Sequence, residues 1–461
     1  MDFNSPIFFL LFLPVFFILY YPAPKPLRIY VGIIGGLLFY SWGYAAYLPL
    51  ILGITLLAFL LGLGIERWRG HGAASLLLWG GVLVNIALIV VFKLSEDLSY
   101  PLGLSFLTFQ VIAYLVEVNN KAGEAERNLL DFSFYLLLFP KLPAGPITRY
   151  RDLRRQIKDI RIEPHDAADG LRRFITGFAK KALIADTLGK VASPVFDLSS
   201  PGISPALAWL ALVSFALQLY FDFSGYSDMA IGLGRMMGFR FVENFNFPYI
   251  SKNIGDFWRR WHISLSTWFR DMVFYPLERR RLAFLGQQVN ILTVFLLTGL
   301  WHGLTLNFVI WGLIHGAALV FEATAPGRRL RGAWAPIQHL YALGVILLGW
   351  VFFASPTPAF AIDFLQRLLG DTRGLEPLPF ELTNPLPFIE PTFLLALFLS
   401  MLLSMPVSGW MGNFFRDLTG GKLALNAALR IAADLGLVFL FFASVAAVAS
   451  AEFIPAIYGN F

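Results

Sequence analysis

Long apolar stretches recur along the chain, separated by short polar segments. The first five are rich in Leu, Ile, Val and Phe and span Ile7–Tyr21, Leu27–Trp42, Tyr47–Ile65, Ala73–Phe92 and Leu102–Val118. Stretches of the same character follow at Ala206–Phe221, Leu340–Phe353, Phe393–Met405 and Leu429–Ala449. A helix of about 20 apolar residues crosses a hydrocarbon core of about 30 Å. The pattern predicts an all-α integral membrane protein with about 10–13 membrane segments.

The pattern changes after Val118, where Pro, Gly and charged residues interrupt the apolar runs. Phe139–Pro146 contains three prolines and a glycine, which forbid a continuous helix. We expect this segment to dip into the membrane or to line its surface. The cations that follow suit either an interfacial helix facing anionic headgroups or a site for a phosphorylated cytosolic cofactor: Arg149, Arg151, Arg154, Arg155, Lys158 and Arg161.

Composition supports lipid as the solvent of this chain. Hydrophobic residues make up 57% of the sequence and charged residues 14%, which a water-soluble protein of this length could not keep dispersed. We treat 1–461 as a single membrane domain, with N-terminal spans in 1–118, broken and interfacial helices in 119–323 and C-terminal spans in 324–461. The absence of cysteine excludes disulfides, thiolate metal sites and a cysteine nucleophile.

The net charge of +6 bears on topology rather than on nucleic acid, which we do not expect as a partner. Basic residues fall in alternate loops at Lys25 and Arg28, Arg67 and Arg69, and Lys121 and Arg127. By the positive-inside rule these loops are cytoplasmic and the N-terminus lies outside.

His302 is the strongest candidate for chemistry. No Asp, Glu, Lys or Arg occurs between Ile291 and Phe321, a run too long for one crossing. We expect a break at Thr298-Gly299 or at Gly303-Leu304, which puts His302 near the junction of two half-segments at membrane depth. A neutral imidazole there can take a proton from a hydroxyl and return it. The alternative is a buried histidine bonded to a neighbour for packing alone.

His262 lies in the polar and aromatic segment Asp256–Asp271. If this segment is one helix, an aromatic stripe forms on one face, and His262 falls with the tryptophans and points towards the core or the bilayer. The stripe consists of Trp258, Trp261, Leu265, Trp268 and Phe269, whereas the opposite face carries Asp256, Arg259, Arg260, Ser266, Thr267 and Arg270. Such a stripe is equally typical of an interfacial anchor.

The remaining histidines and two aspartates rank lower. His315 would lie on a different face from His302 if the helix were unbroken, and we expect solvated surface positions for His71, His165 and His339. Asp222 and Asp228 could hold an imidazole in one tautomer, or could cap a helix. The sequence has no Gly-Lys-Ser/Thr phosphate loop, His-Glu-x-x-His zinc motif or Gly-x-Ser-x-Gly elbow, and we expect no metal.

Several of these segments together resemble the membrane-bound O-acyltransferase family. The resemblance covers about Gly103 to Phe321 and is carried by Phe257–Ser266, Leu300–Gly303, Phe139–Ile147 with Arg149-Tyr150, Asp222–Ala230 and Glu243–Asn246. It implies a helical ring around a thinned central funnel, in which a cytosolic acyl donor meets an acceptor from the other side. It also implies that His302 is catalytic and that His262 lies near it.

Two bacterial branches of the family compete. Trp350–Phe353 and the aromatic end Tyr458–Phe461 resemble the alginate O-acetylase branch. Leu304–Leu306 resembles the branch that D-alanylates lipoteichoic acid, and Phe274–Arg281 lacks the Gly-Gly-Asn-Arg turn of the alginate type. The acyl group therefore stays open between acetyl and D-alanyl.

The resemblance leads us to expect acyl transfer, most simply of acetyl, from a cytosolic thioester to a hydroxyl of an extracytoplasmic polysaccharide or partner protein. The donor would be acetyl-CoA or an acyl carrier protein, no cofactor stays bound, and the location is the bacterial cytoplasmic membrane. His302 would be the general base and His262 would position a group or relay a proton. The substrate-binding candidates are Trp301, Trp258, Trp261, Arg259, Arg260, Asp222, Asp228 and Ser266.

Two readings without acyl-transfer turnover stay open beside this one. A transporter or flippase for a lipid-linked sugar would also show many spans, broken helices and intramembrane histidines. An acylation scaffold without turnover of its own is the other.

Overall fold

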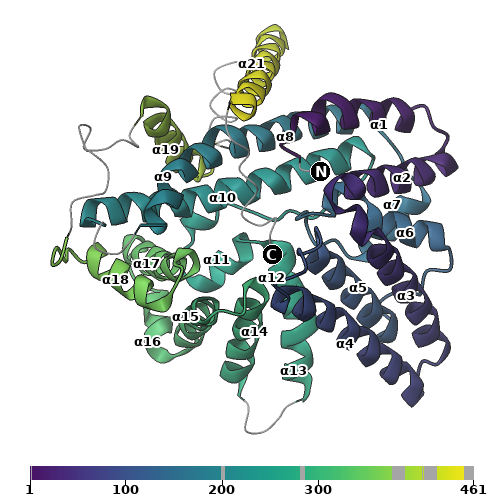
Figure 1. The fold of residues 1–461 in the computed structure, drawn as a ribbon, viewed down its shortest axis with the longest axis horizontal. Helices are drawn as coiled ribbons and strands as arrows, with labels where there is room; N and C mark the ends of the chain where they lie inside the picture. The colour runs from purple at the N-terminus through teal and green to yellow at the C-terminus, as the bar shows by residue number, and fades with distance from the viewer. Residues whose placement is uncertain are drawn as a thin grey trace. The chain divides into compact units, whose positions relative to one another are not determined.

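The structure is a computed structural model that describes residues 1, 3–198, 203–280, 286–375, 390–407, 409 and 423–450. All regular secondary structure in these ranges is helical, as Figure 1 shows, and this agrees with the all-α prediction.

Contacts within the chain group it into two compact units. Unit 1 comprises Met1–Phe178, Gly225–Glu243 and Val448–Phe461, and unit 2 comprises Ala179–Ser224 and Asn244–Ala447. The long helix α10 (Pro205–Met236) contributes to both, because the boundary at residues 224 and 225 falls inside it. The prediction of a single membrane domain stays a prediction.

Unit 1 is built mainly from the N-terminal helices. They are η1 (Phe8–Phe12), α1 (Leu13–Tyr20), α2 (Lys25–Tyr44), η2 (Ala45–Tyr47), α3 (Leu48–Arg67), α4 (Gly72–Leu94), α5 (Leu104–Asn119), α6 (Leu129–Leu137), η3 (Phe139–Lys141), α7 (Tyr150–Lys158) and α8 (Pro164–Ala179). Gly43, whose φ is +119°, bends the chain near the end of α2, just before η2 and α3. Five of the predicted apolar stretches thus correspond to helices.

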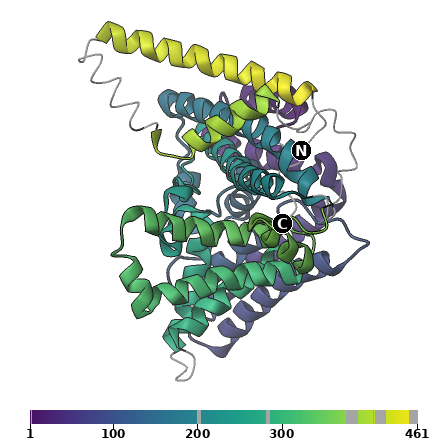
Figure 2. The same ribbon diagram turned by 90° about the vertical axis from the view of Figure 1, so that its left-hand side faces the viewer.

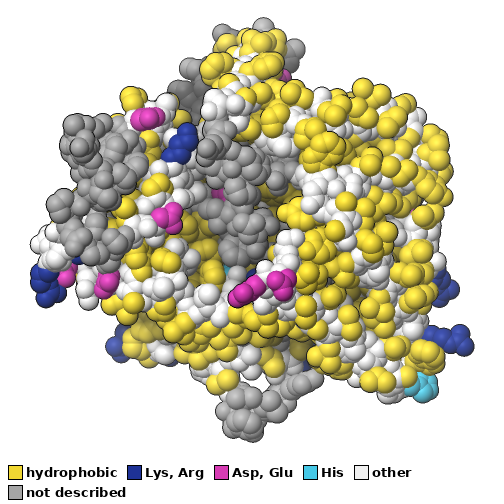
Figure 3. Space-filling model, in the orientation of Figure 1, with side chains coloured by type: hydrophobic (Ala, Val, Ile, Leu, Met, Phe, Trp, Pro, Cys, Tyr) yellow, Lys and Arg dark blue, Asp and Glu magenta, His cyan; other side chains and the backbone are white. Residues whose placement is uncertain are grey.

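The helices expose apolar side chains in a way that requires lipid. Leu76, Leu83 and Leu60 are 76%, 63% and 54% exposed, and Figure 3 shows hydrophobic side chains over the face of the N-terminal helices at the right of the view. Six described stretches are long and apolar enough to cross a membrane: Lys25–Arg67, Gly72–Leu94, Pro205–Met236, Leu306–Ala323, Ala335–Ala354 and Ala427–Ser450. The protein is therefore a multi-pass membrane protein.

The proline-rich segment Phe139–Pro146 forms one 3₁₀ turn, η3, and then runs without a helix to Arg149. The predicted interruption is confirmed. The segment is buried inside unit 1, where the Lys141 ammonium donates to Gln110 Oε1 and lies 3.7 Å from the ring centroid of Tyr135. Its freed backbone groups are thus covered by protein, as broken helices in membranes require.

Unit 2 carries the C-terminal half of the chain. Its helices are η4 (Lys180–Ala185), α9 (Asp186–Phe196), η6 (Pro248–Ile250), α11 (Ile254–Arg260), α12 (Ile263–Phe269), η7 (Arg270–Phe274), α13 (Tyr275–Arg280), α14 (Gln287–His302), α15 (Leu306–Ala323), α16 (Ala325–Leu330), α17 (Ala335–Ala354), α18 (Pro358–Leu368), α19 (Pro391–Leu403) and α21 (Leu423–Ser450). Helix α15 packs against both α14 and α17 (Figures 1 and 2). This trio of helices positions the histidines considered next.

Candidate functional site

His302 is the last residue of α14, and its side chain is buried at 4% exposure. The chain is extended at Gly303 and becomes helical again at Leu306, where α15 begins. The predicted break at Gly303-Leu304 is confirmed. A side chain at position 303 would overlap the present position of the Phe308 ring, so any larger residue here requires that ring to move.

Close backbone contact holds α14 and α15 together. A Cβ added at Gly299 would overlap the carbonyl oxygen of Phe308, and one added at Gly312 would overlap that of Phe295. Because these obstacles are backbone atoms, they cannot rotate away. The two glycines therefore let the helices approach closely, as small residues do in membrane helix pairs, and this fixes the end of α14.

Aromatic rings surround the His302 imidazole. Its ring centroid lies 4.4 Å from that of Trp301, 5.0 Å from that of Trp311 and 5.1 Å from that of Phe353. Trp311 and Phe353 present edge-to-face geometry, with interplanar angles of 87° and 77°. These three rings enclose the His302 imidazole on the sides that the described residues occupy.

His262 interrupts the segment that the sequence predicts as one helix. Its φ and ψ are +42° and 54°, in the left-handed region, and it separates α11 from α12. The prediction of a continuous helix over Asp256–Asp271 is wrong, because a left-handed residue breaks the helical hydrogen-bond ladder.

Asn244 compensates for this break. Its backbone oxygen accepts a hydrogen bond from Ile263 N at 2.9 Å, and its Oδ1 accepts from Ser264 N at 3.2 Å and from Ser264 Oγ at 2.8 Å. These are groups that the first turn of α12 leaves without helical partners. Asn244 thus caps α12 from outside the helix and holds the bend at His262.

The bend sends the two nearby tryptophans in different directions. Trp258 packs against Phe295 and His315, with ring centroids 5.2 and 5.3 Å away. Trp261 instead packs against Phe245 and Trp350, at 5.2 and 5.1 Å. The predicted single stripe is therefore divided between two environments.

Trp301 connects the two candidate histidines. Its ring centroid lies 6.4 Å from that of His262 and 4.4 Å from that of His302. His262 is 1% exposed and meets the ring of Phe223 edge-on at 4.6 Å. The structure thus brings His262, Trp301 and His302 into one buried group.

Unit 2 also contains a cavity of about 430 Å³, whose lining includes Ile263, the residue after His262, but not His262, Trp301 or His302. Its lining includes three predicted site residues, Trp258, Arg259 and Ser266. Further lining residues are Arg270, Phe295 and Thr298, the last of which precedes His302 on α14 by one helical turn. The guanidinium of Arg260 is engaged by Asp256 at 3.0 Å and by the carbonyl oxygen of Asn246 at 3.2 Å.

His315, ranked below the other two histidines from the sequence, and Trp311, which was not a candidate, both lie near His302. His315 is fully buried, and its ring lies 5.3 Å from that of Trp311, which also lies 5.0 Å from the ring of His302. The placement of His315 on a different face from His302 would hold for an unbroken helix, whereas α14 and α15 are separate helices packed side by side. The signal in the sequence was the expected break in the apolar run Ile291–Phe321, because a break allows residues on its two sides, such as His302 and His315, to lie close together.

The two predicted aspartates form ion pairs with basic residues. Asp222 lies 2.8 Å from Lys181 Nζ, which also pairs with Asp186 at 2.6 Å. Burial would lower the pKa of Lys181, but the two carboxylates outweigh it and raise that pKa above its usual value. In unit 1, Asp228 accepts from the guanidinium of Arg173 at 2.7 Å. That either aspartate holds an imidazole in one tautomer stays a prediction.

The other three histidines differ in their exposure. His71 and His165 are exposed, as expected. His339 is half-buried with its Nδ1 3.2 Å from the carbonyl oxygen of Ser251, so its assignment to the solvated surface is wrong. Within the described ranges, no three His, Asp or Glu side chains are grouped so that they could hold a metal ion.

Comparison with known proteins adds independent information. The sequence pattern of MBOAT, the membrane-bound O-acyltransferase family, matches residues 37–326. A probable alginate O-acetylase of Pseudomonas fluorescens is 40% identical over 363 residues, which cover 77% of this chain and 73% of that protein. A peptidoglycan O-acetyltransferase of Helicobacter pylori is 33% identical and covers 80% of both chains. A teichoic acid D-alanyltransferase of Bacillus subtilis is 30% identical, covering 63% of this chain and 78% of that protein.

Proposed function

This chain belongs to the membrane-bound O-acyltransferase family and is an O-acyltransferase, and we propose that it transfers acetyl from a cytosolic thioester to an extracytoplasmic hydroxyl. The observation that carries the proposal is the buried group of His262, Trp301 and His302, formed where α14 breaks. The location proposed with it is the bacterial cytoplasmic membrane, with the N-terminus outside, as the alternation of basic loops indicates.

In the proposed reaction His302 is the general base. Its neutral imidazole takes the proton of the acceptor hydroxyl as the oxygen attacks the thioester carbonyl carbon. The tetrahedral intermediate then collapses, the carbon–sulfur bond breaks, and the imidazolium returns the proton to the leaving thiolate. The products are an ester and a free thiol. His262, which shares Trp301 as a neighbour, would position a reacting group or relay a proton.

The cavity of about 430 Å³ is our candidate for the donor site. Its size falls in the range of small-molecule sites, about 300–1,000 Å³. The walls are largely apolar, which suits an acyl chain and its pantetheine arm, whereas Arg259 and Arg270 could pair with phosphate groups of the donor. Thr298 places one wall a single helical turn from His302.

Acetyl is favoured over D-alanyl by the relatives. The alginate and peptidoglycan acetyltransferases cover more of this chain, at higher identity, than the D-alanyltransferase does. The proposed acceptor is a hydroxyl of a cell-envelope polysaccharide, reached directly or through an extracytoplasmic partner protein. For the D-alanyl alternative, the donor would be a cytosolic acyl carrier protein.

The test is donor choice in proteoliposomes. The purified chain would receive radiolabelled acetyl-CoA on one side and a soluble sugar acceptor on the other, and D-alanyl carrier protein in a parallel series. We expect acetyl-dependent release of free CoA and labelling of the acceptor. Turnover with the carrier protein and none with acetyl-CoA would replace acetyl by D-alanyl, whereas no turnover of either donor with any acceptor would contradict the proposal.

A further inference from the structure

A second cavity, of about 350 Å³, lies in unit 1, far along the sequence from His262 and His302. It is formed by the end of α5, the loop that follows it and α7. Its lining contains four basic side chains, Arg151, Arg154, Arg155 and Lys158, and two carboxylates, Glu117 and Glu124. We refer to it as the α7 pocket, and positive charges outnumber negative charges in its wall.

The sequence of α7 places the four cations on one face. Positions 151, 154, 155 and 158 are spaced as i, i+3, i+4 and i+7, which lie on the same side of a helix. The opposite side, formed by Tyr150, Leu153 and Ile157, is buried in unit 1. Because that side is anchored, α7 must present its cations to the pocket rather than rotate them into lipid.

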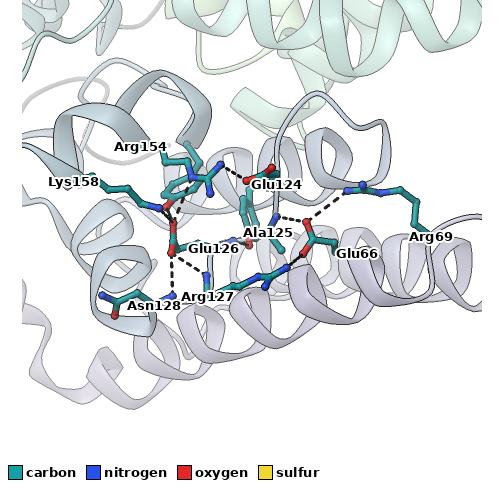
Figure 4. A network of polar contacts seen from close by, with 11 residues as sticks. Glu66, Arg69, Glu124, Ala125, Glu126, Arg127, Asn128, Arg154 and Lys158 are labelled. Carbon is teal, nitrogen blue, oxygen red and sulfur yellow. Dashed lines mark hydrogen bonds and ion pairs between the residues drawn. The ribbon is translucent and has the colours of Figure 1, made fainter.

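The carboxylates around the α7 pocket form hydrogen bonds and ion pairs with basic side chains of α7. Figure 4 shows Arg154 between Glu124 and Glu126, with Lys158 also directed at Glu126. The three contacts are 3.0, 3.6 and 3.5 Å long. Burial alone would raise the pKa of Glu126, but hydrogen bonds from Tyr150 and from the backbone of Asn128 and Arg127 outweigh it and lower the pKa. Glu126 is therefore charged at neutral pH.

The cations keep donors that these contacts do not use. Arg151 reaches Glu117 and Asp152 through its Nε atom, at 3.3 and 3.7 Å, so its two terminal nitrogens stay available. Arg155 is exposed, and its side chain forms no hydrogen bond or ion pair with the residues that the structure describes. Adjacent guanidinium groups with spare N–H donors are the arrangement that binds phosphate in bidentate fashion.

We propose that the α7 pocket binds the phosphate group of an amphiphilic ligand. Arg151 and Arg155 would supply the main donors, with Arg154 and Lys158 at the sides. Tyr114, Val118 and Ala122 contribute to the wall and give the uncharged part of the ligand an apolar surface. The phosphate can come from the headgroup of an anionic membrane lipid or from a soluble phosphate compound. The proposal does not depend on the acyl-transfer step.

Two binding measurements distinguish these sources. Calorimetric titration of the purified full chain in neutral detergent with inorganic pyrophosphate, at constant ionic strength, tests the soluble source. Native mass spectrometry of the chain released from nanodiscs containing phosphatidylcholine and phosphatidylglycerol tests the lipid source. The variants are Arg151→Gln with Arg155→Gln, and Arg329→Gln as the matched control, since Arg329 is an exposed arginine of α16.

We expect the double variant to weaken binding of at least one probe by about tenfold, as two charge-assisted contacts are lost, and Arg329→Gln to bind like the unaltered chain. Loss of pyrophosphate binding identifies a soluble source, and loss of phosphatidylglycerol retention alone identifies a headgroup. Equal binding of both probes by the double variant and the control overturns the proposal. Arg259 and Arg270 line the other cavity. The proposal is also overturned if pyrophosphate binding is lost in the variant that combines Arg259→Gln with Arg270→Gln and is kept in the variant that combines Arg151→Gln with Arg155→Gln. A melting temperature equal to that of Arg329→Gln verifies that the double variant is folded.

Discussion

Asn244→Ala tests whether the bend at His262 is held from outside the helix. Asn244 is 1% exposed, and its Oδ1 accepts from both the N–H and the hydroxyl of Ser264. Removing a side-chain cap costs about 1 kcal/mol, and leaving a buried donor unsatisfied costs about 1–3 kcal/mol. We expect about 2–4 kcal/mol of lost stability in total, and slower acyl transfer because His262 loses its fixed position against Phe223 and Trp301.

The assay is thermal unfolding in detergent together with the rate of acyl transfer. Asn246→Ala is the matched control, since the Asn246 side chain is exposed and the hydrogen bonds that the residue forms run through its backbone N–H and C=O. The control should keep both properties. If Asn244→Ala unfolds at the temperature of Asn246→Ala and transfers acyl groups as fast, Asn244 does not hold the bend and the reasoning is refuted.

Three further predictions concern other parts of the structure. Gly299→Ala should destabilise by about 1–3 kcal/mol, because its Cβ meets the Phe308 carbonyl oxygen; Gly344→Ala in α17, where nothing lies within 4 Å, should be neutral or stabilising in the same melting experiment. Lys181→Met should cost about 3–5 kcal/mol by leaving buried carboxylates uncompensated, and adding Asp222→Asn should recover part of the loss, whereas a double variant less stable than Lys181→Met would contradict this. The fold lowers the pKa of Glu126, so ionised Glu126 stabilises the folded state at pH values above the ordinary Glu pKa. This stabilisation is lost as the pH falls from the ordinary Glu pKa through the lowered one. In that pH range the melting temperature of the unaltered chain should therefore fall more steeply than that of Glu126→Gln.

The helices and two of the three interruptions, at Phe139–Pro146 and after His302, could be predicted from the sequence. The apolar runs define α2 to α5 and the spans of unit 2 because a lipid-facing helix must be apolar over its full length. The break after His302 could also be predicted, since the run from Ile291 to Phe321 is longer than one membrane crossing and contains Gly303. Both arguments use local composition alone.

The bend at His262 could not be predicted from local composition. Nothing in the residue types of Asp256–Asp271 requires a left-handed residue, and the compensation comes from Asn244, eighteen positions earlier. The same holds for Asp222, whose partner Lys181 precedes it by 41 positions and belongs to another helix. Pairings of this kind depend on which helices pack together, and periodicity within one segment does not contain that information.

The central claim is that His302 accepts the proton of the attacking hydroxyl. The most direct measurement is the single-turnover rate of acyl transfer from labelled acetyl-CoA by purified His302→Ala, beside His71→Ala as an exposed histidine control. Loss of a general base lowers such a rate by about 10²–10⁴-fold. We predict a loss of that size for His302→Ala at an unchanged melting temperature, with His71→Ala unaffected. A folded His302→Ala that keeps the rate of the unaltered chain would contradict the account.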